Sequence, residues 1–151
     1  MGNILRFALQ MELDGKNFYH KQALLIQEPY AKRVFLNLAD DEEKHYEQIK
    51  SLLDTATFRY LDSEQLKAIQ NIFTSNSFVV EPDMHVFDIL NIALRFEQLS
   101  VKFYHELAEI SEGDAKNAFL LLKEEEQKHK QQVWQLMQLL QRPEEWYPYL
   151  D

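Results

Sequence analysis

Apolar residues recur at intervals of three and four positions along four long stretches of the chain, which is the spacing of one face of an α-helix. The stretches cover residues 4–27, 30–53, 84–111 and 114–141. Pro29 suits the first turn of the second helix, Asp83 suits the N-cap of the third, and Gly113 suits the stop before the fourth. Short connections join the first helix to the second and the third to the fourth, so we expect each of these pairs to be antiparallel.

Residues 55–83 differ in composition, because Ser, Thr, Asn and Asp interrupt the apolar pattern. A short helix from Ser63 to Phe73 is the regular structure that the pattern supports here. A connection of this length is uncommon within a compact bundle. It is long enough to travel along a helix of about 25 residues, which measures roughly 37 Å. The pattern as a whole predicts an all-α protein.

The chain has 151 residues, enough for one domain with a sizeable core, and we place that domain over residues 1–151. It contains no cysteine, which excludes disulfides and cysteine-ligated metal sites. The formal net charge of −9 argues against binding to nucleic acid or to an anionic membrane, and it favours solubility and attraction of cations. No apolar run has the length of a membrane span and no signal peptide is evident, so we expect a cytoplasmic location.

Two of the apolar stripes contain the same polar pair, a glutamate followed three residues later by a histidine. Glu42 and His45 form the first pair, and Glu126 and His129 form the second, 84 residues further on. Residues three apart on a helix share a face, so each pair can direct a carboxylate and an imidazole at one point. The surrounding segments also match, with FLNLADDEEKH at 35–45 and FLLLKEEEQKH at 119–129.

The other two stripes repeat a different segment, with ALQMELDGKNFYH at 8–20 and ALRFEQLSVKFYH at 93–105. Each copy has one glutamate within its apolar stripe. Four helices thus offer four carboxylates and two imidazoles, which is the ligand pattern of a dinuclear carboxylate site in a four-helix bundle. Such a set suits two metal ions, with iron favoured and manganese as the alternative. The proposed ligands are Glu12, Glu42, His45, Glu97, Glu126 and His129.

A solvated helix surface is the alternative for each Glu-x-x-His pair. Residues 40–47 and 123–130 around the two pairs are strongly charged, and either copy alone would fit such a surface. Four carboxylates buried at matching positions, however, would cost several kcal/mol without a compensating charge. The repeat of the spacing within four apolar stripes therefore favours the metal site.

On these residues the chain resembles the ferritin-like diiron-carboxylate superfamily, and within it the rubrerythrin-like branch. The resemblance covers residues 4–141. It implies an antiparallel four-helix bundle in which one long crossover, here residues 55–83, joins the second and third long helices. Many rubrerythrins carry a cysteine-rich rubredoxin domain for electron delivery. This sequence has no cysteine, so the resemblance implies an external electron donor.

The resemblance also suggests roles for two acidic residues beside the ligands. In many proteins of the superfamily, an acidic residue directly before the motif glutamate hydrogen-bonds the metal-bound histidine of the opposite half. Asp41 and Glu125 occupy this position, which pairs Asp41 with His129 and Glu125 with His45. A solvent-facing position is the alternative for both acids.

Tyr19 and Tyr104 follow the single glutamates Glu12 and Glu97 by seven residues and share their helix faces. Each could hydrogen-bond a ligand carboxylate or take part in redox chemistry, which makes both candidate catalytic residues; simple core packing is the alternative. One position departs from the family pattern. Rubrerythrins usually carry another glutamate three residues after the third-helix ligand, where this chain has Ser100, and this weakens the implication of rubrerythrin-type peroxide reduction.

Three functions remain open at this point. We favour a diiron oxidoreductase that acts on peroxide or dioxygen. The second is a ferritin-like protein that takes Fe(II) as its substrate and oxidises or stores it. The third is a metal-stabilised structural bundle without turnover. We also expect a homo-oligomer, with a dimer favoured, and no nucleic-acid or membrane partner.

Overall fold

The computed structural model describes residues 2–56, 63–74, 80–81 and 83–141. Within these ranges the backbone forms five α-helices and no strand. Four of them are the long helices that the apolar pattern predicts, and the short third helix lies in the connection between the second and the fourth. The helices are α1 (Gly2–Leu25), α2 (Pro29–Lys50), α3 (Ser63–Thr74), α4 (Val86–Glu109) and α5 (Gly113–Gln141).

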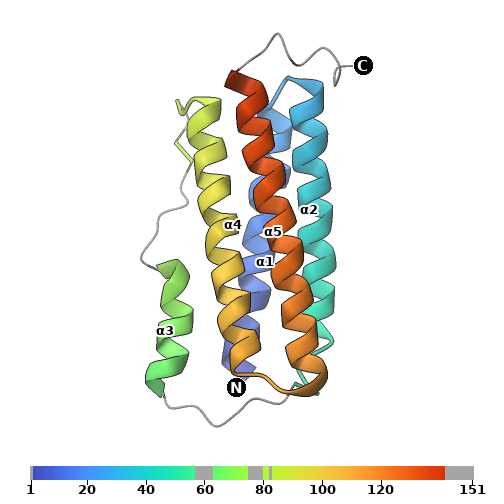
Figure 1. Ribbon diagram of the computed structural model, residues 1–151. Coiled ribbons are helices and arrows are strands. Elements are labelled where there is room, and N and C mark those ends of the chain that lie inside the picture. Colours follow the sequence, from blue (N-terminus) through green and yellow to red (C-terminus); the bar gives the residue numbers. More distant parts are fainter. Residues whose placement is uncertain (1, 57–62, 75–79, 82, 142–151) are drawn as a thin grey trace.

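The four long helices lie side by side in one bundle (Figure 1). Helices α1 and α5 run in one direction, and α2 and α4 run in the opposite direction, so each short connection joins an antiparallel pair. Because α2 and α4 are parallel, the chain must travel the length of the bundle between them. Helix α3 lies within this crossover and packs on α4 and α1. The expected antiparallel bundle with one long crossover is confirmed.

The ends of the helices show which local expectations were correct. Pro29 begins α2, and the Glu28 side chain caps this helix by accepting hydrogen bonds from the backbone N–H groups of Tyr30 (3.0 Å) and Ala31 (2.6 Å). The prediction that Asp83 caps the next long helix was wrong. His85 is the N-cap of α4, and its Nδ1 accepts a hydrogen bond from the backbone N–H of Phe87 at 3.2 Å.

The connection between α4 and α5 also differs from the expectation. Ile110, and not Gly113, is the C-cap of α4. Gly113 is instead the first residue of α5 and has a φ of +60°. This is the left-handed region, where a residue with a Cβ atom is strained, so the conformation expected of a glycine after a helix is present, but at the start of α5 and not at the C-cap of α4.

The hydrophobic core consists of two clusters that meet at a polar layer. One cluster fills the end of the bundle where α1 begins, and the other fills the opposite end. On α1, α2 and α5, the buried charged residues fall between the residues of one cluster and those of the other, and on α4 Glu97 directly follows Phe96, where the first cluster begins. The polar layer therefore lies near the middle of the bundle, with apolar packing on both sides of it.

Helix α3 covers one side of the first cluster with aromatic contacts. The ring of Phe73 lies 5.7 Å from that of Phe96, 5.5 Å from that of Phe103 and 6.2 Å from that of Phe7, measured between centroids. Such contacts stabilise the docking of a short helix that would be marginal alone. The crossover thus shields part of the α1 and α4 surface.

No helix in the described ranges is both long enough and apolar enough to span a lipid bilayer.

Candidate metal centre

The six residues predicted as ligands meet in the polar layer at the middle of the bundle. One comes from α1, two from α2, one from α4 and two from α5. Each is at most 3% exposed, although all six are ionisable. The surface alternative for the two Glu-x-x-His pairs is therefore incompatible with the structure. The residues are Glu12, Glu42, His45, Glu97, Glu126 and His129.

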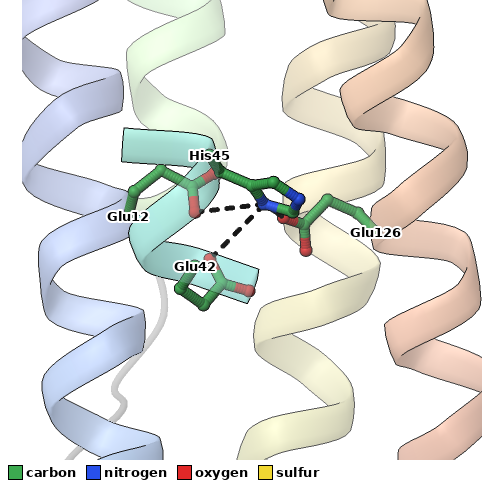
Figure 2. A group of neighbouring side chains, drawn as sticks. All are labelled: Glu12, Glu42, His45 and Glu126. Atoms are coloured by element: carbon green, nitrogen blue, oxygen red, sulfur yellow. Dashed lines mark ion pairs between the residues drawn. The ribbon is translucent and has the colours of Figure 1, made fainter. Parts of the chain in front are cut away.

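His45 is surrounded by three carboxylates from three helices. Its Nδ1 lies 2.9 Å from Glu126 Oε1, 3.5 Å from Glu12 Oε2 and 4.0 Å from Glu42 Oε2. Figure 2 shows these four side chains pointing toward one another from α1, α2 and α5. They form the first of two groups in which each residue offers one donor atom and these atoms lie within 4.8 Å of one another.

His129 has a matching environment on the other side of the cluster. Its Nδ1 lies 3.1 Å from Glu42 Oε1, 3.6 Å from Glu126 Oε2 and 3.7 Å from Glu97 Oε1. These four residues form the second group, again with donor atoms within 4.8 Å. Glu42 and Glu126 belong to both groups, so the two groups share two carboxylates. The two imidazole rings are nearly parallel, with an interplanar angle of 19° and centroids 5.4 Å apart.

The outer nitrogen of each imidazole contacts the acidic residue that the resemblance pairs with it. His129 Nε2 lies 3.1 Å from Asp41 Oδ2, and His45 Nε2 contacts Glu125 Oε2. Both acids are partly exposed, with 40% and 44% of the side chain accessible. A proton held on Nε2 by such a contact leaves Nδ1, which faces the carboxylates, free to act as a ligand.

The two candidate tyrosines reach across the bundle to the opposite half. Tyr19 donates a hydrogen bond to Glu97 Oε1 at 2.5 Å, and Tyr104 donates one to Glu12 Oε1. Both tyrosines are fully buried. Each glutamate that belongs to a single donor group is therefore held by a phenol from the other sequence repeat.

The buried charges shift the protonation of the cluster. Burial and the neighbouring Glu12 and Glu126 raise the pKa of Glu42 well above its usual value, and burial and Glu126 do the same to the pKa of Glu97. Burial would lower the pKa of His45, but the close carboxylates of Glu12 and Glu126 outweigh it and raise that pKa to about 11. Near neutral pH the cluster therefore holds protons that offset part of its negative charge.

The pKa values of His129 and Glu126 shift in opposite directions, and both shifts favour the charged form. Burial opposes ionisation of both, but contacts of His129 with Asp41, Glu126 and Glu42 raise the pKa of the imidazole. The nearby side chains of Glu97, His129 and His45 outweigh burial and lower the pKa of Glu126. On the outside of the cluster, the hydrogen bond with His129 lowers the pKa of Asp41.

The donor atoms of the cluster fit metal ions better than they fit one another. Seven buried side-chain atoms among the described residues lack a hydrogen bond of normal geometry, and six belong to the cluster. Buried polar atoms without partners are rare in folded proteins. Five of the six are carboxylate oxygens and one is His45 Nδ1, which are the atoms that iron and manganese prefer as ligands.

Two small residues lie one helical turn beyond the single glutamates of α1 and α4. A Cβ atom on Gly15 would lie 3.0 Å from Phe96 Cε1 and 3.4 Å from Glu42 Oε2, so the glycine gives room to an aromatic ring beside the cluster. Ser100 is fully buried, and its Oγ donates a hydrogen bond to the backbone carbonyl of Phe96 at 2.9 Å.

The remaining histidines lie outside the cluster. His20 is exposed, and His85 caps α4. His105 Nδ1 lies 3.0 Å from Lys123 Nζ. None of the three belongs to a donor group in the described part of the chain.

A bundle of this topology with a buried carboxylate–histidine cluster at its centre defines a ferritin-like protein. Comparison with protein families gives the particular family, because the Rubrerythrin family model matches residues 3–82 and 88–149. The chain belongs to the rubrerythrin family. No curated protein sequence gave a significant match.

A solved structure supports the fold independently. A protein of Thermotoga maritima, provisionally described as a ferritin-like diiron-carboxylate protein, matches with a TM-score of 0.69. The match covers 91% of this chain and 93% of that one, at 23% sequence identity. At this identity the likeness establishes the fold, and the two chains are similar over nearly their whole lengths.

Proposed function

We propose that the cluster binds two metal ions. Glu12 and His45 would hold one ion and Glu97 and His129 the other, with Glu42 and Glu126 shared between them. The observation that carries this proposal is the pair of overlapping donor groups, each with all its donor atoms within 4.8 Å. Four carboxylates supply up to four negative charges, which two divalent ions would neutralise.

Iron is the favoured metal and manganese the alternative. Hard carboxylate oxygens with one imidazole per ion suit both metals. Membership of the rubrerythrin family and the diiron-carboxylate description of the Thermotoga maritima protein support iron.

The residues around the cluster would position the ligands. Tyr19 and Tyr104 fix one oxygen each of Glu97 and Glu12 through hydrogen bonds. Asp41 and Glu125 hold the imidazoles with Nδ1 directed inward. The apolar clusters on both sides limit the access of water, which strengthens the electrostatic interactions within the site.

We further propose that the protein is an oxidoreductase that reduces peroxide or dioxygen. Bound iron would supply the electrons for that reduction, and an external donor would restore them. Oxidation of Fe(II) as a substrate is the second candidate function, because the same shared carboxylates would bind the Fe(II) ions. A structural role for the metal is the third.

The test begins with the metal content of the protein after anaerobic loading with Fe(II). Two irons per chain are expected, followed by rapid near-ultraviolet absorption of oxidised iron when peroxide is added. Repeated turnover of peroxide with a chemical reductant would identify the oxidoreductase, and continued oxidation of excess Fe(II) would identify the second candidate. A chain that binds no metal would contradict the proposal.

A further inference from the structure

The buried position of the cluster raises the question of how an ion reaches it. All six proposed ligands are at most 3% exposed, so a hydrated ion cannot contact them from outside. On the α1 and α4 side, the ring of Phe96 fills the space beside Gly15 and Glu42, and α3 packs its own Phe73 against that ring. This side is closed by aromatic packing.

The side formed by α2 and α5 is different. A pocket of about 260 Å³ lies between these two helices. Three pairs of residues line it, and the members of each pair are 84 positions apart in the repeat: Asp41 with Glu125, Lys44 with Lys128, and Gln48 with Gln132. The pocket therefore straddles the two matching halves of the site.

The inner end of this pocket reaches the cluster itself. His129 lines it, although that side chain is only 3% exposed. Asp41 and Glu125 connect the pocket to the two imidazoles, since each has about two fifths of its side chain in solvent and a carboxylate oxygen against a buried Nε2. On this side, the contacts of His129 with Asp41 and of His45 with Glu125 therefore join the pocket lining to the cluster.

We propose that this α2–α5 pocket is the route by which divalent metal ions reach the cluster, and that Lys44 and Lys128 limit the rate of uptake. An incoming cation meets the carboxylates of Asp41 and Glu125 before it meets the histidines. The ammonium groups compete with it, and Lys44 Nζ lies 3.9 Å from Asp41 Oδ1. This inference rests on the proposed metal-binding function.

Two double variants test the route without changing any proposed ligand. K44Q/K128Q removes two positive charges from the pocket, and we expect uptake to accelerate by about three- to tenfold at low ionic strength. The acceleration should shrink at high salt, because exposed charges are screened. Q48W/Q132W narrows the pocket and should slow uptake. Both variants should still bind two ions.

Matched controls separate the pocket from general effects on the same helices. K50Q/K130Q makes the same change in net charge at exposed positions outside the pocket lining. Q131W places the same bulky side chain at the exposed neighbour of Gln132. Both controls should take up metal at the wild-type rate.

The rate is measured by stopped-flow absorbance with Co(II) as the probe, and the end point by metal analysis. If K44Q/K128Q and Q48W/Q132W both match wild type in rate while binding two ions, the route is wrong and the metal site stands. An equal acceleration in K50Q/K130Q would also overturn the route, because net charge alone would then explain it. If wild type binds no Co(II) and no Fe(II), the proposed function fails and the route fails with it.

Discussion

At the scale of single residues, the six proposed ligands are not equivalent. Glu42 and Glu126 belong to both donor groups, whereas Glu12 and Glu97 each belong to one. Loss of a shared carboxylate should therefore affect both ions.

We expect E126A/H129A to bind fewer than two metal ions per chain. The double variant removes one shared carboxylate and one of the two imidazoles, so one donor group loses two of its four residues. Metal analysis after anaerobic Fe(II) loading measures the stoichiometry, and circular dichroism checks that the helices are retained.

The matched control is E124A/Q127A, which has the same spacing on the same helix at exposed positions. This control should bind as many ions as wild type. Two ions retained by E126A/H129A would contradict the site assignment.

The tyrosine hydrogen bonds give a second prediction. In metal-free protein, Y104F leaves Glu12 Oε1 buried without its donor, and we expect the free energy of unfolding to fall by about 1–3 kcal/mol. Urea denaturation measures it. Y46F, at a half-buried position on α2, should change stability by less than about 0.5 kcal/mol. Equal stabilities of Y104F and wild type would show that the phenol contributes packing alone.

The sequence predicted the ligand residues better than the contacts around them. Spacing along one helix is enough to place Glu42 and His45 on a shared face, and likewise Glu97 and Tyr104. Such pairs can therefore be predicted from the sequence alone. That Tyr104 donates to Glu12, across the bundle, depends on the packing of two helices. The pocket residues Lys44 and Lys128 were missed, although they obey the same 84-residue repeat and could have been found from it.

At the scale of helices, Gly15 on α1 gives room to the ring of Phe96 on α4. We expect G15A to lower the free energy of unfolding by about 1 kcal/mol. Alanine favours a helix over glycine by about 1 kcal/mol, but its Cβ would lie 3.0 Å from Phe96 Cε1 and 3.1 Å from Phe96 Cζ. Phe73 packs against that ring and limits its movement, so crowding of about 1–3 kcal/mol should outweigh the gain.

A double-mutant cycle with F96L checks the cause of this loss. Leucine removes the ring that the new Cβ would contact, so G15A should be neutral or stabilising in the F96L background. The same cost in both backgrounds would mean that crowding against Phe96 is not the reason. Urea denaturation of the four metal-free proteins provides the comparison.

Helix positions were predictable from the sequence, and helix ends were less so. Asp83 was chosen as the cap of α4 because aspartate has a strong general preference for that position. The structure uses the imidazole of His85 instead, a choice that depends on where α4 docks. In the same way, Leu52 and Leu53 continue the apolar pattern of α2, but they lie in a turn after the helix ends at Lys50.

At the scale of the whole molecule, the bundle holds a charged layer between two apolar clusters. The sequence predicted that the proposed ligands lie within apolar stripes and meet at one site, but it did not predict the division of the core into two clusters. The packing of the two apolar clusters must offset the free-energy cost of burying six ionisable residues. Bound metal ions would reduce that cost. The linkage between folding, protons and metal is therefore a property of the entire bundle.

The linkage between proton binding and folding makes the metal-free protein less stable as pH rises. The pKa of His45 is raised from 6.5 to about 11, so its contribution to stability is complete below pH 6.5 and is lost as pH rises toward 11. The pKa values of Glu42 and Glu97 are raised in the folded protein too. As pH rises above about 4.5, these groups lose their protons in the unfolded chain before they lose them in the folded one, so the free energy of unfolding falls. The lowered pKa of Asp41 acts in the opposite direction, but only at acidic pH.

We therefore expect the melting temperature of the metal-free protein to fall between pH 6 and pH 9, whereas that of the metal-loaded protein should change less. The ions require neutral imidazoles and ionised carboxylates, so loading should release protons, at least about one per ion at neutral pH. A pH indicator in weakly buffered solution measures this release during titration with Mn(II). The E126A/H129A variant, which lacks one imidazole and one shared carboxylate, should release fewer. Uptake of two ions without proton release would show that the cluster is already deprotonated before metal binds.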